Sequence, residues 1–377
     1  MKKVILSVTN DLFSDQRVDK VCNTLLEMGF DVSLVGRRYN DSPKIAKRSY
    51  KTFRLHLFFR TGPLFYAEFN LRLFFWLLFH HFDIYVANDL DTLLPNVLIS
   101  KIKRKKLVYD AHEYFLGILE IQDRPKVKKV WSIIEHFCFP KLKKVITVSQ
   151  SIADLYHQQY GKEVKVVRNI PILRNEKMMD KTSIRKELEL PIDKPIIIYQ
   201  GNAIHRDRGG EEIVEAAPFI DNGIVLIVGQ GDVVPDLQKR VQEMGWKDRV
   251  IFTGRVTPEL LRKYTAAADI GVTFDKNVSP NHYYSLPNKL FEYIHAGIPI
   301  IASNLPERKR IIEEYGVGVV LEDLSPEFVG KVINDMLQDS TKMEQYRENC
   351  YKAALKLNWQ EEEKVLREIY NEVTGNR

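Results

Sequence analysis

The sequence predicts an α/β protein made of two Rossmann-like domains whose parallel sheets face each other across a cleft. The chain has 377 residues, which is the length of two ordinary domains. Strand and helix signals alternate along it, a pattern that favours parallel sheets with crossover helices. The alternation pauses at a polar stretch, residues 172–194, and then begins again. Two successive sheets joined by a linker follow from these observations.

The first domain is predicted to span residues 1–171. It opens with a strand at Val4–Val8, a helix at Asp15–Met28 and a second strand at Asp31–Val35. Further apolar runs predict strands at Ile84–Ala87, Lys106–Tyr109, Val145–Val148 and Val164–Val167. In open sheets of this kind, ligands bind beyond the carboxyl ends of the strands.

The second domain is predicted at residues 195–357, after a linker at 172–194 that has prolines at its edges. Its expected strands are Ile196–Tyr199, Ile224–Val228, Val250–Phe252, Ile270–Val272, Ile298–Ala302 and Val317–Leu321. A charged terminal helix, 358–377, carries an apolar stripe that includes Trp359, Leu366 and Tyr370, so it must cover another surface.

Composition restricts the class of protein. Hydrophobic residues make up 45% of the chain and charged residues 28%, as in soluble globular proteins. Cys22, Cys138 and Cys350 are scattered, which predicts neither a disulfide framework nor a zinc site and favours a reduced, cytoplasmic setting. The apolar run after Met1 is too short for a signal peptide.

The positive charge is concentrated in the first half of the chain. Residues 1–180 carry 30 Lys and Arg against 19 Asp and Glu, a net +11, whereas the remainder carries −5, giving the overall +6. This bias suits an anionic membrane surface or ligand. No nucleic-acid-binding motif accompanies it, so nucleic acid is not an expected partner.

An aromatic segment, Phe53–Phe82, contains Arg54, Arg60 and Arg72. Its apolar core, Leu73–Phe79, is far shorter than the roughly 20 residues of a spanning helix. A buried helix explains most of the aromatic residues, and contact with anionic lipid is the interpretation favoured for the arginines.

The most informative stretch is Ser285–Ser303, which reads SLPNKLFEYIHAGIPIIAS. Ser285 is expected to be the N-cap of a helix that Gly297 ends, followed by a buried strand. The free N–H groups of a helix start attract phosphate, and Lys289 adds a positive charge there. Asn288 and Glu292 lie on one helical face, where a carboxylate can accept hydrogen bonds from a sugar diol. The stretch therefore predicts a nucleotide-binding element.

This stretch resembles the signature helix of retaining glycosyltransferases of family 4, which have the GT-B fold. The resemblance implies that the helix start, with Ser285, Leu286, Asn288 and Lys289, holds the donor diphosphate and that Glu292 holds the ribose. Tyr284 and Ser285 would face the donor sugar. The family has a pair of glutamates with seven residues between them. Glu292 matches the second glutamate, and Tyr284 occupies the place of the first, which is not acidic here.

Two further segments match the donor side of the family. In the segment after Tyr199, Arg208 precedes Gly209 and resembles the basic residue that grips the diphosphate. Asn202 stands where the family often has a second basic residue, and Arg206 is a candidate substitute. Gly254, Arg255 and Val256 follow a strand at the place where relatives hold the nucleobase.

Three loops of the first domain are candidates for the acceptor side and the chemistry. The segment from Thr9 to Arg17 lacks the glycines of a dinucleotide site, so NAD binding of that kind is not expected. In the resembling family this loop faces the acceptor and the transferred group, and the resemblance therefore implies that Asn10, Asp15 and Arg17 lie on the acceptor side. An alternative for Asp15 is simple helix capping, the interpretation also favoured for Asp91. Asp89 is an acceptor-side candidate. His112 ends a strand at the position where the resembling family carries a His near the reacting sugar, so the resemblance makes Asp89 and His112 candidate catalytic residues.

The favoured hypothesis is a retaining, metal-independent hexosyltransferase of surface polysaccharide synthesis. It would use a UDP- or GDP-sugar without any cofactor and a glycan or polyprenyl-linked acceptor. We expect it in the cytoplasm, with peripheral contact at the inner face of the membrane left open. A nucleotide-sugar 2-epimerase of the same fold and a non-catalytic nucleotide-sugar-binding protein are the alternatives, because fold resemblance does not decide among them.

Overall fold

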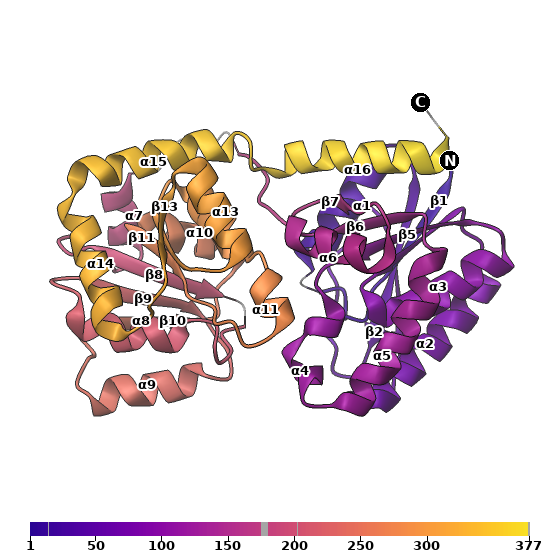
Figure 1. Ribbon diagram of the computed structural model, residues 1–377, viewed down its shortest axis with the longest axis horizontal. Helices are drawn as coiled ribbons and strands as arrows, with labels where there is room; N and C mark the ends of the chain where they lie inside the picture. The colour runs from indigo at the N-terminus through magenta and orange to yellow at the C-terminus, as the bar shows by residue number, and fades with distance from the viewer. Residues whose placement is uncertain (14, 175–179, 202, 376–377) are drawn as a thin grey trace. The chain divides into compact units, whose positions relative to one another are not determined.

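The computed structural model describes residues 1–13, 15–174, 180–201 and 203–375, and the chain divides into two compact units (Figure 1). The first unit comprises Met1–Asn169, Ser279–Asn281 and Glu361–Arg377, and the second comprises Ile170–Val278 and His282–Gln360. Both are α/β units with parallel sheets, which is the fold class that the sequence predicted.

The first unit is built on a seven-stranded sheet in the order β3-β2-β1-β4-β5-β6-β7, and all its strand pairs are parallel. The strands are β1 (Lys3–Ser7), β2 (Asp31–Arg38), β3 (Lys51–His56), β4 (Ile84–Asn88), β5 (Lys106–Ala111), β6 (Lys144–Thr147) and β7 (Lys165–Val166). The sequence did not predict β3, most of which falls in the aromatic segment Phe53–Phe82.

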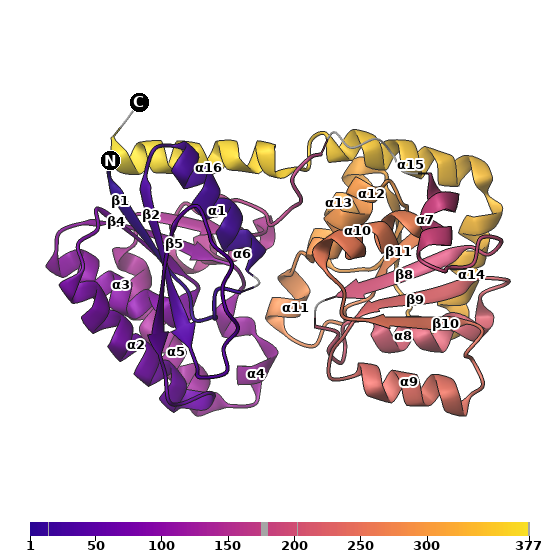
Figure 2. The same ribbon diagram turned by 180° about the vertical axis from the view of Figure 1, so that it is seen from behind.

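Helices cover both faces of this sheet (Figure 2). Its helices are α1 (Gln16–Glu27), α2 (Gly62–Phe79), α3 (Leu90–Ile102), α4 (Leu119–Gln122), α5 (Pro125–Cys138), α6 (Gln150–Tyr160) and the terminal α16 (Trp359–Thr374), with 3₁₀ turns η1 (Phe115–Gly117) and η2 (Phe139–Lys141). Helices α2, α3 and α5 pack side by side. Helix α16 packs on α1, where Thr24 Oγ1 donates to Glu363 and Arg367 pairs with Glu27.

The second unit is built on a six-stranded parallel sheet in the order β10-β9-β8-β11-β12-β13. Its strands are β8 (Ile196–Gly201), β9 (Ile224–Gly229), β10 (Val250–Gly254), β11 (Ile270–Thr273), β12 (Ile300–Ser303) and β13 (Gly318–Leu321). Its helices are α7 (Lys181–Glu187), α8 (Gly210–Ala216), α9 (Val234–Glu243), α10 (Pro258–Ala267), α12 (Asn288–Ala296), α13 (Pro306–Tyr315), α14 (Pro326–Gln338) and α15 (Ser340–Ala354), with the 3₁₀ turn η3 (Ala217–Phe219). The short helix α11 (Pro280–Tyr284) is divided between the two units after Asn281.

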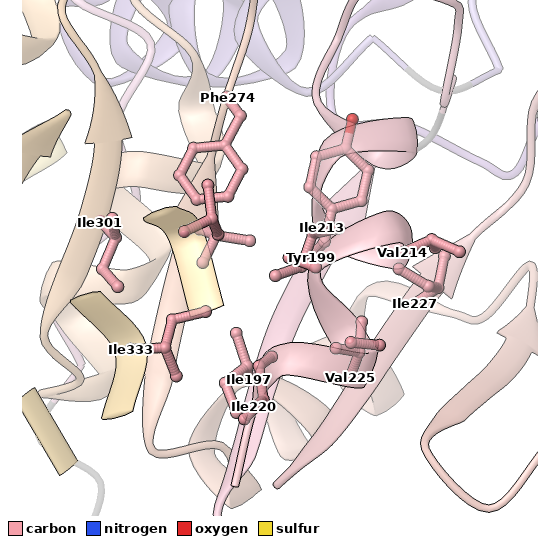
Figure 3. Packing of buried hydrophobic residues seen from close by; sticks show 14 of the residues in the cluster. Ile197, Tyr199, Ile213, Val214, Ile220, Val225, Ile227, Phe274, Ile301 and Ile333 are labelled. Carbon is pink, nitrogen blue, oxygen red and sulfur yellow. The ribbon is translucent and has the colours of Figure 1, made fainter. Parts of the chain in front are cut away.

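The alternation of side chains along β8 builds two cores, one on each face of the second sheet. Ile197 and Tyr199 join a cluster under α8, α9 and α14 that includes Ile213 and Phe274 (Figure 3). Ile196 and Ile198 point the other way, into a cluster formed with α10, α12 and α15. Because both faces are covered, the strands are apolar throughout, which is why the sequence signal for them was strong.

Part of the predicted linker is structured. Helix α7 lies within residues 172–194, and its Lys181 and Arg185 both pair with Asp269 of the second unit. Residues 175–179 of the predicted linker lie outside the described residues.

Two predicted helix caps are wrong. Helix α12 begins at Asn288 with Pro287 at its N-cap position, and Ser285 is not the cap. The Oγ of Ser285 instead donates to the carbonyl of His282, because α11 ends directly before it. Asp91 lies inside the first turn of α3, and Asp89 takes the N-cap position with a φ of 61°. By contrast, Asp15 accepts from the N–H of Val18 and caps α1.

No helix in the described part of the chain combines the length and the apolarity that crossing a bilayer requires.

Candidate functional site

A cluster of three cations around one carboxylate occupies the carboxyl end of the second sheet. Asp275, which follows β11, pairs through Oδ1 with Arg208 Nη1 at 3.1 Å and through Oδ2 with Arg308 Nη2 at 2.8 Å. Arg308 is completely buried, whereas about a third of the Arg208 side chain (33%) is exposed. Asp275 therefore pairs with two guanidinium groups, that of Arg208, which can reach a ligand, and that of Arg308, which cannot. We call Arg208, Asp275, Lys289 and Arg308 the cationic cluster.

Charge and burial compete within this cluster. Burial opposes the ionisation of Asp275, but the positive charges of Arg308, Lys289 and Arg208 outweigh it and hold the pKa of Asp275 below its ordinary value. Burial lowers the pKa of Lys289 to about 8, although Asp275 opposes this shift. The Nζ of Lys289 lies 3.9 Å above the ring of Tyr199, a cation–π contact.

The backbone around Arg208 is held close to the end of β11. The hydroxyl of Tyr199 donates to the carbonyl of Arg208 over 2.8 Å. Gly209 has a φ of 98°, and a Cβ there would lie 2.7 Å from the Cβ of Phe274. Only glycine can adopt this φ without strain and also avoid a clash with Phe274, which explains why a glycine follows Arg208 in the sequence.

The start of α12 is anchored by Arg308. Its Nη1 donates to the carbonyl of Ser285 and its Nη2 to the Oγ of Ser285, at 3.4 and 3.3 Å. These hydrogen bonds from Arg308 fix the turn from Ser285 to Pro287. Asn288, at the first position of α12, is exposed. Leu286 packs on the core beneath α12, so only its backbone is available to a ligand.

Glu292 projects from α12 toward β8. Gln200 Nε2 donates to Glu292 Oε2, and Gln200 Oε1 accepts from Thr265 Oγ1 over 2.8 Å. This chain of hydrogen bonds orients the carboxylate of Glu292.

A pocket near the ends of β8, β9 and β10 contains two residues of the predicted nucleobase segment, Arg255 and Val256. Gly254 ends β10 directly before them. The pocket is lined by Gly201, Val228, Gly229, Gln230, Arg255, Val256 and Leu261. A Cβ on Gly229 would lie 1.9 Å from the carbonyl oxygen of Gly201, so the end of β9 needs glycine at this position in order to meet the end of β8.

Two predicted donor residues lie apart from the cationic cluster. The side chain of Arg206 is 74% exposed and its Nη2 is 3.9 Å from Asp236 on α9. Tyr284 ends α11, where its ring packs edge-on against Tyr283. Asn202 lies outside the described residues.

In the first unit, His112 is placed between two carboxylates at the ends of β4 and β5. Its Nδ1 is 3.5 Å from Asp89 Oδ2, and its Nε2 is 3.5 Å from Asp110 Oδ2. Burial alone would lower the pKa of His112, but these two carboxylates raise it to about 9. The imidazole is therefore a cation at neutral pH and can donate a hydrogen bond.

The acceptor-side candidates have different surroundings. Asn10 Nδ2 donates to Asp15 Oδ2 over 2.7 Å, so these two residues stabilise one loop. Arg17 is buried, pairs with Asp110 at 2.7 Å and donates to the carbonyl of Val167. Its guanidinium thus supports the strand end that carries His112.

Two acidic neighbours of this site, Asp91 and Glu113, were given no role in the chemistry from the sequence, which favoured helix capping for Asp91. Asp91 accepts from Thr9 Oγ1 over 2.6 Å, and burial together with the charge of Asp89 raises its pKa to about 8. Burial and the charge of Asp89 raise the pKa of Glu113 to about 7. Across the described residues, no group of three or more His, Cys, Asp or Glu side chains is arranged to hold a metal ion.

Two family models match the chain, one on each unit. Residues 15–170 match Glycosyltransferase Family 4, and residues 180–354 match Glycosyl transferases group 1. Among curated proteins, the D-inositol 3-phosphate glycosyltransferase of Xylanimonas cellulosilytica is 22% identical over 202 residues, which are 52% of this chain and 47% of that protein. The match therefore spans about half the length of that relative.

Solved structures share the fold along the whole chain. WaaG, a glycosyltransferase involved in lipopolysaccharide biosynthesis, has a TM-score of 0.76 at 16% identity, covering 97% of this chain and 99% of its own. Anabaena HepE, solved with UDP and glucose, has a TM-score of 0.75 at 15% identity, covering 99% and 100%.

Proposed function

This chain belongs to the family 4 glycosyltransferases of GT-B fold, and from that premise we propose that it moves a hexose from a nucleoside-diphosphate sugar to an acceptor hydroxyl with retention of configuration. The proposed acceptor is a glycan or a polyprenyl-linked sugar of surface polysaccharide synthesis. The role of WaaG in lipopolysaccharide biosynthesis supports that assignment.

The observation that carries the proposal is the cationic cluster beside Glu292. A diphosphate placed at the start of α12 would meet the exposed part of Arg208, Lys289 and the free N–H groups of the helix. Glu292, four residues after Asn288, would then accept from the ribose hydroxyls one helical turn away.

In the proposed reaction, these cations neutralise the charge that develops on the departing diphosphate. We therefore propose a transfer in which Arg208, Lys289 and the helix start do what a divalent ion does in other glycosyltransferases. Ser285 would contact the donor sugar through its backbone, with Tyr284 in place of the family's first glutamate.

The proposed contribution of the first unit is to bind the reacting sugar and the acceptor. Protonated His112 would donate a hydrogen bond to a sugar hydroxyl, and Asp89 would hold the imidazole in position. Asn10 and Asp15 would line the acceptor side, while Arg17 acts only through Asp110.

The pocket that contains Arg255 and Val256 is the proposed nucleobase site. The UDP bound to HepE supports a UDP-sugar, and GDP-sugars are the second donors to test.

We also propose that the protein contacts anionic lipid through the carboxyl-terminal ends of α2 and α3. Phe79 and Ile102 are 75% and 59% exposed. Lys103 Nζ donates to the carbonyls of Leu77 and His80, so the two helix ends lie together. Residues 101–106, KIKRKK, contain five basic side chains beside these apolar ones, of which Lys105 pairs with Asp83. Apolar and basic side chains together suit an anionic bilayer surface.

Two of the three arginines that the sequence suggested for this contact, Arg60 and Arg72, pair with carboxylates, and Arg54 donates to the carbonyl of Pro43. Arg60 makes two hydrogen bonds of 2.8 Å to Asp41, and Arg72 Nε donates to Glu68 over 2.8 Å. Their charges are largely cancelled, so the ends of α2 and α3 are the better candidate. Phe79→Ser with Ile102→Ser should abolish cosedimentation with phosphatidylglycerol vesicles and leave nucleotide binding intact. Equal cosedimentation with neutral phosphatidylcholine vesicles would contradict the role of charge.

Thermal shift with UDP- and GDP-sugars tests the main proposal. A ligand at a hundredfold its Kd should stabilise the protein by about 2.7 kcal/mol. Arg208→Ala and Glu292→Ala should abolish the shift, whereas Lys239→Ala, which removes an exposed charge on α9, should keep it. Release of UDP or GDP that requires an acceptor would identify a transferase. A shift that survives in both Arg208→Ala and Glu292→Ala would refute the assigned site.

A further inference from the structure

Asp275 is an anion placed inside a site whose proposed ligand is also an anion. Besides its two guanidinium partners, its Oδ2 accepts from Thr273 Oγ1 over 3.2 Å, and its backbone carbonyl accepts from Ser303 Oγ over 2.7 Å. The side chain is only 3% exposed. These contacts fix the carboxylate from several sides, so it cannot swing away when a ligand arrives.

The two guanidinium partners of Asp275 have different positions. Arg308 is buried completely and holds Ser285, so its charge needs a permanent counter-ion. Arg208 is partly exposed and can share its donors between Asp275 and a phosphate. The carboxylate therefore stays beside Arg208 while a ligand is bound, and its negative charge acts on that ligand.

The charge of the ligand changes during transfer. A free nucleoside diphosphate carries about one more negative charge at pH 7 than its sugar ester, because the second pKa of a terminal phosphate is near 6. A fixed negative charge next to the site repels the more anionic molecule more strongly. Lys289 and Arg208 attract both molecules. Repulsion by Asp275 weakens the binding of the nucleoside-diphosphate product more than the binding of the sugar nucleotide.

We infer that Asp275 sets the preference of the site for the nucleotide-sugar donor over the nucleoside-diphosphate product, and so favours product release. This inference rests on the proposed function and assigns to it a specificity-determining residue. Asp275 itself forms no bond in the transfer.

The test compares two dissociation constants in wild type and two variants. The ligand pairs are UDP with UDP-glucose and GDP with GDP-mannose, measured by calorimetry at pH 7. Asp275→Asn should tighten binding of the diphosphate relative to the sugar nucleotide by about tenfold, as expected for one charge at close range in a partly solvated site. Inhibition of turnover by UDP or GDP should strengthen in parallel.

A second variant separates charge from structure, because Asp275→Asn leaves Arg308 buried without a counter-ion. Asp275→Asn combined with Arg308→Gln removes one charge of each sign and keeps the formal charge of the wild-type site. If charge sets the preference, the ratio of the two dissociation constants returns to the wild-type value in this double variant. If the role of Asp275 is purely structural, the variants should bind both ligands more weakly to the same extent. The ratio of the two dissociation constants should then be unchanged in every variant.

The possible outcomes are distinct. Wild-type protein that binds neither pair contradicts the proposed function, and the inference is lost with it. Wild-type protein that binds a pair, with a ratio that Asp275→Asn does not change, contradicts the inference alone.

Discussion

The backbone N–H of His112 donates a 2.7 Å hydrogen bond to Asp89 Oδ1, and the imidazole of the same residue lies 3.5 Å from the other carboxylate oxygen. Asp89 therefore fixes both the backbone at the end of β5 and the imidazole ring of His112. It does so from a backbone φ of 61°, a conformation that non-glycine residues adopt only when their surroundings enforce it. The charge on His112 is thus part of what stabilises this end of the first sheet.

The first prediction concerns the pH dependence of stability. Because the carboxylates raise the pKa of His112 from 6.5 to about 9, the charged ring stabilises the fold fully below pH 6.5, and this stabilisation is lost as the pH rises through 9. It amounts to roughly 3 kcal/mol. His112→Gln should lower Tm most near pH 6 and little at pH 10. His81→Gln, at an exposed position, is the control, and parallel Tm curves for wild type and His112→Gln would contradict the assignment.

The second prediction concerns Lys289 and donor binding. Its pKa of about 8 means that the ammonium loses its proton above that pH, while the diphosphate of a nucleotide sugar stays ionised. Wild-type affinity for the donor should be constant below pH 7 and fall by about tenfold between pH 8 and 9.5, the effect of losing one close charge. Lys289→Arg should bind independently of pH in this range, because a guanidinium does not titrate there. Calorimetry across this pH range would measure the donor affinity of wild type and of Lys289→Arg. A wild-type affinity that does not change with pH would show that the charge of Lys289 does not contribute to donor binding.

The sequence was sufficient to predict the two sheets because their inner strands are covered on both faces and are therefore continuously apolar. The strand that was missed, β3 (Lys51–His56), lies at the edge of the first sheet and is buried only in part, as are the other edge strands β7, β10 and β13. An edge strand needs no such apolar run, and KTFRLH followed by aromatic residues looked like the start of a helical segment. Strand ends also shifted by a few residues, as with β12, which begins at Ile300 rather than Ile298.

The donor site could be predicted only in part. The stretch from Ser285 to Ser303 indicated α12 because a helix start, Lys289 and Glu292 are close in sequence. Asp275 and Arg308 are far apart in the chain and meet only because β11, β12 and α13 are neighbours. Arg308 lies in PERKR, which has the composition of a solvated helix, so nothing local in the sequence shows that its side chain is buried.

A third prediction concerns Glu135 on α5. Tyr160 donates its hydroxyl to Glu135 Oε1 over 2.6 Å, and burial raises the pKa of Glu135 to about 7. The folded state therefore favours the protonated acid, and a destabilising contribution develops as the pH rises from 4.5 through 7. Glu135→Gln keeps an acceptor for Tyr160 without the charge. It should leave Tm unchanged near pH 4 and stabilise the protein by up to about 3 kcal/mol at pH 8 in urea titrations. Destabilisation at pH 8 would show that the ionised carboxylate is needed.

The last prediction uses Gly209 to test how tightly the backbone that carries Arg208 is held. Gly209→Ala should cost about 1–2 kcal/mol for the positive φ, and more because the new Cβ would meet Phe274 at 2.7 Å. Gly245 has a similar conformation, φ 73°, but open space around it, so Gly245→Ala bears the backbone cost alone. Because the clash must move the loop, Gly209→Ala should also weaken binding of the nucleotide sugar, whereas Gly245→Ala should not. Equal affinity in both variants would mean that the position of Arg208 does not depend on the contact between Gly209 and Phe274.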